Sequence, residues 1–213
     1  IIVKNGYLAR DLNLFYSHYI KYKSNLLPYV TAKLAVSKDF FTINKKNKWI
    51  TNKYSRGRVH LMRSQHDCII TSSKTINKDN PQLNCRINGL ERRSPARIIL
   101  DKKLDISTKS KIIREAASYK TVIFYNLFNK KKIKFLNKFK VKTYRIPLDI
   151  NGSIDLVETL KKAKTIGFSR IFLESGLELT NSFLQSNLVD DLKIFISKTK
   201  LNKNGKYSAK KKY

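Results

Sequence analysis

The sequence predicts an α/β protein in which helices flank a central, largely parallel sheet. Short apolar runs of strand length recur along the chain, and segments with helical spacing of apolar residues lie between several of them. Strands that alternate with helices are typical of parallel sheets covered by helices. With 213 residues, of which 41% are apolar, the chain has the size and composition of one globular domain with a substantial core.

The first part of the chain is predicted to be a helix over residues 6–22, because its apolar residues recur at helical spacing. Pro28 ends this helix, and the apolar run at 29–37 predicts a central strand. A second helix is predicted over 52–64, where Thr51 or Asn52 can cap the N-terminus.

The rest of the chain repeats this alternation. A helix is predicted over 152–167, with Gly167 as its C-terminal stop, and another begins near Leu179. The tail from Lys198 to Tyr213 is basic and poor in apolar residues, which predicts a loop or a frayed end. Further strands are predicted at 68–70, 95–101, 121–125, 142–147, 170–174 and 192–196.

The net charge of +30 first suggests a nucleic acid or an anionic membrane as partner. The lysines, however, are scattered outside the apolar runs, and they accompany an excess of Asn, Ile, Phe and Tyr, which A/T-rich codons also encode. We therefore interpret the charge as solvated surface and expect neither a nucleic acid nor a membrane as partner. Two distant cysteines form no zinc or disulfide motif, which favours a reducing cytoplasm.

A polar stretch follows the strand at 68–70. Hydroxyl residues come first, from Thr71 to Thr75, then Asp79-Asn80-Pro81, and then the basic residue Arg86. In α/β proteins, ligands bind where strands end, and small hydroxyls let a phosphate or sugar approach the backbone. The alternative is a serine-threonine turn followed by an Asn-Pro turn with no ligand.

Several motifs of the chain resemble the reductase half of the bacterial bifunctional riboflavin-biosynthesis deaminase/reductase. They are Thr-x-x-x-Asp-Asn-Pro-x-Leu-x-x-Arg over 75–86, the upstream segments 33–37 and 49–63, and Glu174 downstream. The resemblance runs from about Leu8 to Lys198 and implies a dihydrofolate-reductase-like fold. It implies an inter-domain linker helix at 1–27, following a missing deaminase domain, and a reductase domain at 28–213 that is truncated at its C-terminus.

The resemblance also implies an activity. It is the NADPH-dependent reduction of 5-amino-6-(5-phosphoribosylamino)uracil, a phosphorylated ribosylaminopyrimidine, by an enzyme that forms a homodimer or homotetramer. Lys33, Asp79 and Glu174 are implied to cluster at the reacting centre. The implied cofactor-binding residues are Ala35, Trp49, Thr75, Asp79, Lys102, Gly176, Leu177 and Leu179, and the implied substrate-binding residues are Asn47, Arg63, Leu83, Arg86 and Glu174.

This sequence departs from the family pattern at several of these motifs. Phe40 replaces a glycine after Asp39, Asn47 replaces a serine, and Ser175 replaces a glycine. Lys102 stands where the family usually has a serine, and with Lys103 it is predicted to contact the 2′-phosphate of the cofactor. Arg63 and Arg86 are suited to the substrate phosphate, whereas Glu178 adds a negative charge near the cofactor phosphates.

Two other functions remain open from the sequence. A reductase of the same fold that acts on a pterin is disfavoured by the Asp79-to-Arg86 motif. A basic RNA-binding module would need aromatic residues interleaved with basic ones on one face, but Tyr and Phe lie mostly at core spacing.

Overall fold

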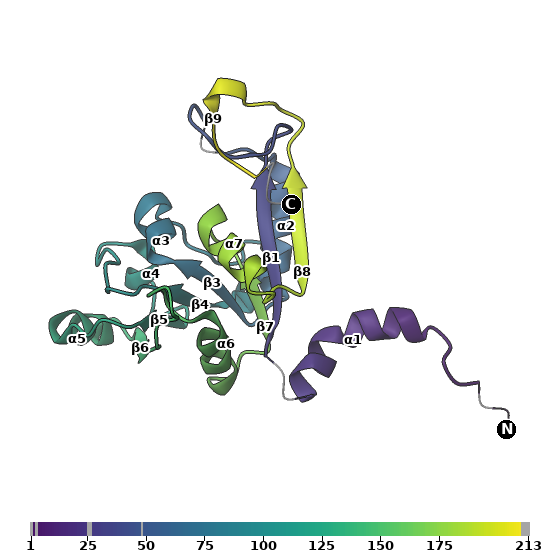
Figure 1. Cartoon of the computed structure of the whole chain (residues 1–213), viewed down its shortest axis with the longest axis horizontal. Coiled ribbons are helices and arrows are strands. Elements are labelled where there is room, and N and C mark those ends of the chain that lie inside the picture. The colour runs from purple at the N-terminus through teal and green to yellow at the C-terminus, as the bar shows by residue number, and fades with distance from the viewer. Residues whose placement is uncertain (1, 3, 25–26, 48, 210–213) are drawn as a thin grey trace.

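A computed structural model of the chain describes residues 2, 4–24, 27–47 and 49–209. Its centre is a seven-stranded sheet with the order β6-β5-β4-β3-β7-β1-β8, and every strand pair in it is parallel (Figure 1). The predicted α/β class with a largely parallel sheet is therefore confirmed. The strands are β1 (Tyr29–Val36), β3 (Cys68–Ser72), β4 (Ala96–Leu100), β5 (Thr121–Tyr125), β6 (Lys142–Arg145), β7 (Arg170–Leu173) and β8 (Asp191–Ile196).

The strand order reverses direction in the middle of the sheet. The chain runs outward from β3 to β6, and then returns to place β7 between β3 and β1 and β8 on the far side of β1. Because all seven strands are parallel, their carboxyl ends share one edge. Ligands of such sheets bind at this edge, at the point where the strand order reverses.

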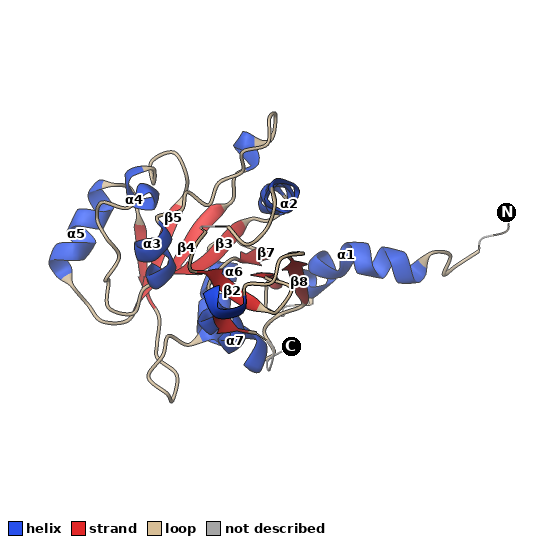
Figure 2. Cartoon of the chain, turned by 90° about the horizontal axis from the view of Figure 1, so that it is seen from above, coloured by secondary structure: helices blue, strands red, loops and turns tan. Residues whose placement is uncertain are grey.

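Helices cover both faces of the sheet, as Figure 2 shows for α2 and α7. Successive strand residues point to opposite faces, so Ile69 packs in one core layer and Ile70 in the other. The layer of Ile69 also holds buried residues of α2 (Lys53–Ser64), α3 (Ser73–Asp79), α4 (Lys111–Arg114) and α5 (Lys130–Lys138). The layer of Ile70 holds buried residues of α6 (Leu156–Thr165) and α7 (Leu177–Gln185).

A second, two-stranded antiparallel ribbon joins β2 (Phe41–Asn44) to β9 (Gly205–Ser208). The predicted loop or frayed end at 198–213 is therefore wrong over the 3-10 helix Asn202–Asn204 and β9, while residues 210–213 lie outside the described part. Since β9 pairs with β2 and not with β8, it adds no strand to the large sheet, and the assignment of 28–213 as a truncated reductase domain stays a prediction.

Asp39 fixes the base of this ribbon. Its carboxylate accepts hydrogen bonds from Ser37 Oγ at 2.6 Å, from the Leu201 N–H at 3.0 Å and from the Asn202 N–H at 2.7 Å. Desolvation alone would raise the pKa of Asp39, but these hydrogen bonds outweigh it and lower the pKa to about 2. The carboxylate therefore stays ionised at neutral pH and joins the segment that precedes β2 to the segment that precedes β9.

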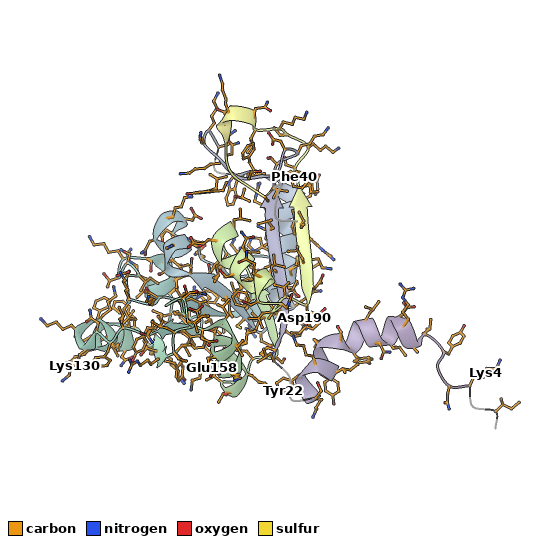
Figure 3. All side chains as sticks on the ribbon, viewed as in Figure 1. Lys4, Tyr22, Phe40, Lys130, Glu158 and Asp190 are labelled. Carbon is orange, nitrogen blue, oxygen red and sulfur yellow. The ribbon has the colours of Figure 1, made fainter. Side chains whose placement is uncertain are left out.

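Position 40, where the family has a glycine, has a left-handed backbone conformation although its residue is Phe. Phe40 has a φ of 64° and lies where the ribbon leaves the body (Figure 3). A left-handed conformation costs an L-residue with a side chain roughly 1–2 kcal/mol. The Phe40 ring packs on a small apolar cluster with Leu34, Val36 and Ala209, and this packing offsets the strain.

Gly205→Ala is expected to disrupt the ribbon. A methyl group at Gly205 would lie 2.2 Å from two ring carbons of Phe41, and such overpacking typically costs about 1–3 kcal/mol. We expect a lower free energy of unfolding in urea and faster proteolysis within 41–44. Gly57→Ala is the matched control, because its added methyl meets nothing within 4 Å on helix α2 and raises helix propensity. Equal stability changes in the two variants would contradict the expectation.

Helix α1 (Ala9–Lys23) extends away from the body and contains no buried residue (Figure 1). Its last turn is held by an ion pair of 2.7 Å between Lys21 and Asp190 and by Lys164, whose Nζ lies 5.0 Å from the Tyr22 ring centroid (Figure 3). The helix predicted over 6–22 is confirmed from Ala9 onward. The assignment of 1–27 as an inter-domain linker stays a prediction, and residues 1, 3, 25 and 26 lie outside the described part. Within the described residues, no helix combines the length and apolar character needed to span a membrane.

Candidate active site

A cleft of about 1830 Å³ opens at the carboxyl edge of the sheet. Its lining comes from β1, from the segments after β3, β4 and β7, from α2 and α7, and from the β2–β9 ribbon. Pockets for one small molecule typically measure about 300–1,000 Å³, so the cleft has room for two ligands. All the residues singled out in the sequence line it: Lys33, Ala35, Asn47, Trp49, Arg63, Thr75, Asp79, Leu83, Arg86, Lys102, Glu174, Gly176, Leu177 and Leu179.

An ion pair between Arg63 and Glu174 lies in the wall of the cleft. Arg63, in the last turn of α2, donates from Nε at 2.9 Å and from Nη2 at 2.8 Å to the two carboxylate oxygens of Glu174, directly after β7. Its Nη1 donates to the Asn84 carbonyl at 2.9 Å. The guanidinium of Arg63 is thus engaged at all three nitrogens, and its positive charge is neutralised by Glu174.

The pKa of Glu174 follows from these contacts. Burial alone would raise it, but the charge and hydrogen bonds of Arg63, together with the charge of Lys33, lower it below its usual value. Glu174 is therefore a carboxylate at neutral pH. The same interaction raises the pKa of Arg63 despite its burial.

Lys33 projects from the middle of β1 toward the same wall. It is partly buried, and no hydrogen bond or ion pair to another residue of the described part holds its ammonium group. Burial lowers the pKa of Lys33; the charge of Arg63 acts in the same direction, and the charge of Glu174 opposes both. Lys33 is thus a cationic group that gives up its proton more readily than an exposed lysine.

Asp79 lies at the rim of the cleft, apart from these charges. It is the last residue of α3 and is exposed, and no hydrogen bond or ion pair of its side chain is present among the described residues. The structure brings Lys33 and Glu174 together but leaves Asp79 outside their cluster. Its place at the reacting centre stays a prediction.

The loop between α3 and Arg86 has an unusual backbone. Asn80 ends α3 with a φ of 41°, and the buried Leu83 has a φ of 53°. Non-glycine residues in this region of φ cluster at functional sites, where the surrounding structure holds them. Here the Asn80 side chain accepts a hydrogen bond of 2.9 Å from the Lys111 N–H, and Leu83 packs in the core layer of Ile69.

His60 occupies the space between Arg63 and Arg86. Its Nδ1 lies 3.1 Å from the Asn84 carbonyl oxygen, and its Nε2 lies 3.3 Å from Nη2 of Arg86. The sequence places Arg56, His60 and Arg63 on one stripe of α2, a pattern that usually marks a solvated face. In the structure this stripe lines the cleft, so helical spacing was the signal that could have identified His60.

The first turn of α7 supplies backbone donors to the cleft. Gly176 is its N-cap and provides no side-chain cap, and a Cβ at Gly176 would meet nothing within 4 Å. The first N–H groups of a helix have no partner within the helix and attract anions. The unexpected charge of Glu178 is paired with Lys74 at 3.1 Å, which reduces its repulsion of an anion.

Lys102 and Trp49 lie at other parts of the lining. Lys102 follows β4 in the chain. Its ammonium group donates to the carbonyl of Gly152, which lies in the loop between β6 and α6. The Trp49 side chain is 55% exposed, with the guanidinium of Arg56 5.0 Å from its ring centroid. An exposed indole in a cleft offers an apolar surface to a planar ligand.

Comparisons with known proteins agree with this architecture. A family model described as RibD C-terminal domain matches residues 28–201. The riboflavin biosynthesis protein RibD of Aquifex aeolicus is 31% identical over 191 residues, which cover 89% of this chain and 51% of that protein. The 5-amino-6-(5-phosphoribosylamino)uracil reductase of Buchnera aphidicola subsp. Acyrthosiphon pisum is 28% identical over 165 residues, which cover 72% of this chain and 76% of that protein.

Solved structures show the same fold. RibD of Acinetobacter baumannii superposes with a TM-score of 0.76 at 24% identity, covering 93% of this chain and 54% of that one. The riboflavin biosynthesis reductase of Saccharomyces cerevisiae gives a TM-score of 0.69 at 23% identity, covering 93% and 87%. These likenesses confirm the expected dihydrofolate-reductase-like fold. This chain spans about half the length of the RibD relatives that it matches.

Proposed function

Because this chain belongs to the RibD C-terminal domain family, we propose that it catalyses a reduction in riboflavin biosynthesis. The substrate is 5-amino-6-(5-phosphoribosylamino)uracil, and the product is 5-amino-6-(5-phosphoribitylamino)uracil. The Buchnera relative that this chain covers over most of its length carries the name of that reductase.

The observation that carries the proposal is the charged wall of the cleft. Lys33, Arg63 and Glu174 come from β1, α2 and the end of β7, and they meet where the strand order reverses. A reductase needs little more than a site that holds donor and acceptor in contact and supplies a proton. The volume of the cleft accommodates both ligands beside these charges.

The residues of the lining fit a nicotinamide dinucleotide phosphate. The uncapped first turn of α7 offers backbone donors to the pyrophosphate, and the exposed Trp49 indole offers an apolar surface. We propose that Ala35, Thr75, Leu177 and Leu179 complete this side of the cleft and that Lys102 lies toward the 2′-phosphate. When bound, NADPH supplies the hydride that reduces C1′ of the ring-opened ribose.

On the substrate side, Arg86 is better suited than Arg63 to the phosphate. Glu174 already neutralises Arg63, whereas no carboxylate within the described residues forms an ion pair with the exposed side chain of Arg86. Asn47 and Leu83, which also line the cleft, contribute a polar and an apolar contact.

We propose that Lys33 donates the proton that the reduction of the sugar requires. Its pKa is lowered by burial, it lies beside a carboxylate that fixes the sugar hydroxyls, and its ammonium group is free to turn toward the sugar. General acids in enzymes are tuned in this way toward the working pH. Glu174 remains ionised and orients the sugar, and Asp79 contacts the ligands from the rim.

The experiment that tests the proposal follows the conversion of the substrate to its ribityl product by mass spectrometry. We expect product with NADPH and none without it. Dihydrofolate serves as the competing acceptor, since a pterin reductase would oxidise NADPH with that compound instead. Oxidation of NADPH with dihydrofolate and none with the ribosylaminopyrimidine would overturn the proposal.

We expect NADPH to stabilise the protein more than NADH in a thermal-shift measurement, because Lys102 and Lys103 place two positive charges at the end of β4. Lys102→Glu is expected to remove most of this difference. Lys109→Glu makes the same charge change outside the cleft lining and is the control. Equal stabilisation of the wild type by the two dinucleotides would contradict this prediction.

A further inference from the structure

Two arginines of the cleft are held by different kinds of partner. Glu174 neutralises Arg63 through two charged hydrogen bonds. Arg86 is held by neutral groups: its Nη1 donates to Oε1 of Gln82 at 3.2 Å, and its Nη2 lies 3.3 Å from Nε2 of His60. Within the described residues, no carboxylate forms an ion pair with Arg86.

His60 can act as an acceptor for Arg86. A guanidinium only donates hydrogen bonds, so Nε2 accepts from Arg86 in the tautomer of His60 that carries its proton on Nδ1. In that tautomer Nδ1 donates to the Asn84 carbonyl at 3.1 Å, whereas in the other tautomer Nδ1 accepts from the backbone N–H of Arg86 at 3.2 Å. Burial and the charges of Arg63 and Arg86 lower the pKa of His60, against opposing effects of the Asn84 carbonyl and Glu174, so the imidazole is neutral at neutral pH.

Gln82 is itself held by hydrogen bonds to Glu115 and to the buried Arg97. Its side-chain Nε2 donates to Oε1 of Glu115 at 2.9 Å, and its backbone carbonyl accepts from Nη1 of Arg97 at 3.0 Å. Arg97 is fully buried and also bonds Thr121 and the carbonyls of Ile112 and Tyr119. The side chain that accepts from Arg86 Nη1 is therefore held by Glu115, and its backbone is held by the buried Arg97.

The distinction between neutral and charged partners matters for ligand binding. A carboxylate that orients an arginine also cancels its charge, and an incoming anion must then compete with that carboxylate. A neutral imidazole or amide orients the guanidinium by hydrogen bonds alone and leaves the full charge for the ligand.

We propose that His60 and Gln82 are positioning residues for Arg86, which they orient toward the substrate phosphate without neutralising it. The ligand class, a sugar phosphate, rests on the proposed function. The arrangement of the acceptors around Arg86 does not.

The test compares His60→Gln with His60→Glu. Both side chains carry an acceptor oxygen at similar reach and both favour a helix, but only Glu adds a charge that neutralises Arg86. We measure the Kd of ribose 5-phosphate by calorimetry. His60→Gln is expected to bind within about threefold of the wild type, and His60→Glu to bind at least about tenfold more weakly.

Steady-state kinetics give the second readout. The substrate KM is expected to rise in His60→Glu with little change in kcat, because Arg63 retains Glu174, and the affinity for NADPH is expected to stay the same. Gln82→Met, which removes the second acceptor at similar volume, is expected to raise the same KM. A purely structural role for His60 would instead lower the melting temperature of both position-60 variants alike.

Two results would overturn the inference: equal affinity of His60→Gln and His60→Glu for ribose 5-phosphate, or no binding of this compound by the wild type. A different result would distinguish failure of the proposed function from failure of this inference. If the wild type binds ribose 5-phosphate with the expected pattern of variants but forms no ribityl product, the positioning of Arg86 stands and the proposed reaction is wrong.

Discussion

Replacing Lys33 by Met is expected to raise the melting temperature while lowering turnover by about 10²–10⁴-fold, the usual contribution of a positioned general acid. Burial disfavours the charged form of Lys33, and Met fills a similar volume without this cost. Glu174 keeps its bidentate partner Arg63 in the variant, so it is not left as an uncompensated charge. Stability and activity are therefore expected to change in opposite directions.

The pH dependence of stability provides a check on the same variant. Because the pKa of Lys33 is lowered in the folded state, the unfolded chain binds more protons between that lowered value and the ordinary value of 10.5. The free energy of unfolding then gains a component that rises with pH across this interval. This component is expected to be absent from Lys33→Met.

Lys38→Met is the control for Lys33→Met. Lys38 follows the same strand but is exposed and outside the cleft lining, so its replacement should leave melting temperature and turnover close to those of the wild type. Near-normal turnover of Lys33→Met, combined with a large drop in melting temperature, would assign Lys33 a structural role and remove it from the reaction.

Glu174→Gln is expected to lower the free energy of unfolding by about 3–5 kcal/mol, the usual cost of leaving a buried charge without its partner. Arg63 is 9% exposed and would lose its only carboxylate partner among the described residues. The lysine beside it would add to the uncompensated positive charge. Urea denaturation measures the loss, and turnover is expected to fall much more than the affinity for NADPH.

The double variant Arg63→Met/Glu174→Gln separates the loss of the pair from the cost of an unpaired charge. It is expected to recover a large part of the stability lost by either single change, because neither member of the Arg63–Glu174 pair is left without its partner and only Lys33 loses its neighbouring carboxylate. The pKa of Glu174 is lowered in the folded state, so its stabilising contribution is present above the ordinary carboxyl pKa and is lost as the pH falls through the lowered value. The difference between wild type and Glu174→Gln should therefore shrink in acid. Strictly additive single changes would argue against a coupled pair.

The sequence was sufficient to predict the helices and strands that form the core. The strand at 121–125 and the helix at 53–64 agree with the predicted segments to within one residue, because they show strong apolar runs or helical spacing. Helix α3 was missed, since residues 71–75 also suit a serine-threonine turn, and Ile76 is its only buried apolar residue. Strands β2 and β9 were missed because they pair only with each other and neither alternates clearly: β2 is half-buried throughout, and β9 is mostly exposed.

The site was predictable in its composition but not in its pairings. Motif resemblance identified residues that all line one cleft. It did not reveal that Arg63, expected at the substrate phosphate, is bonded to Glu174, because that contact joins residues distant in sequence. Nor did it identify His60, whose relation to Arg86 depends on the course of the loop after α3.

The strand order also constrains how this protein folds during synthesis. Strand β1 emerges early, yet its two partners are β7 and β8, near the other end of the chain. Pairings between residues so distant in sequence form slowly, and until they form, β1 exposes apolar residues that favour association between chains. Lys33 and Glu174 are brought together by the pairing of β1 with β7. The charged wall of the cleft is therefore assembled late in folding, after synthesis has passed β7, even though two of its three charges, Lys33 and Arg63, come from the first third of the sequence.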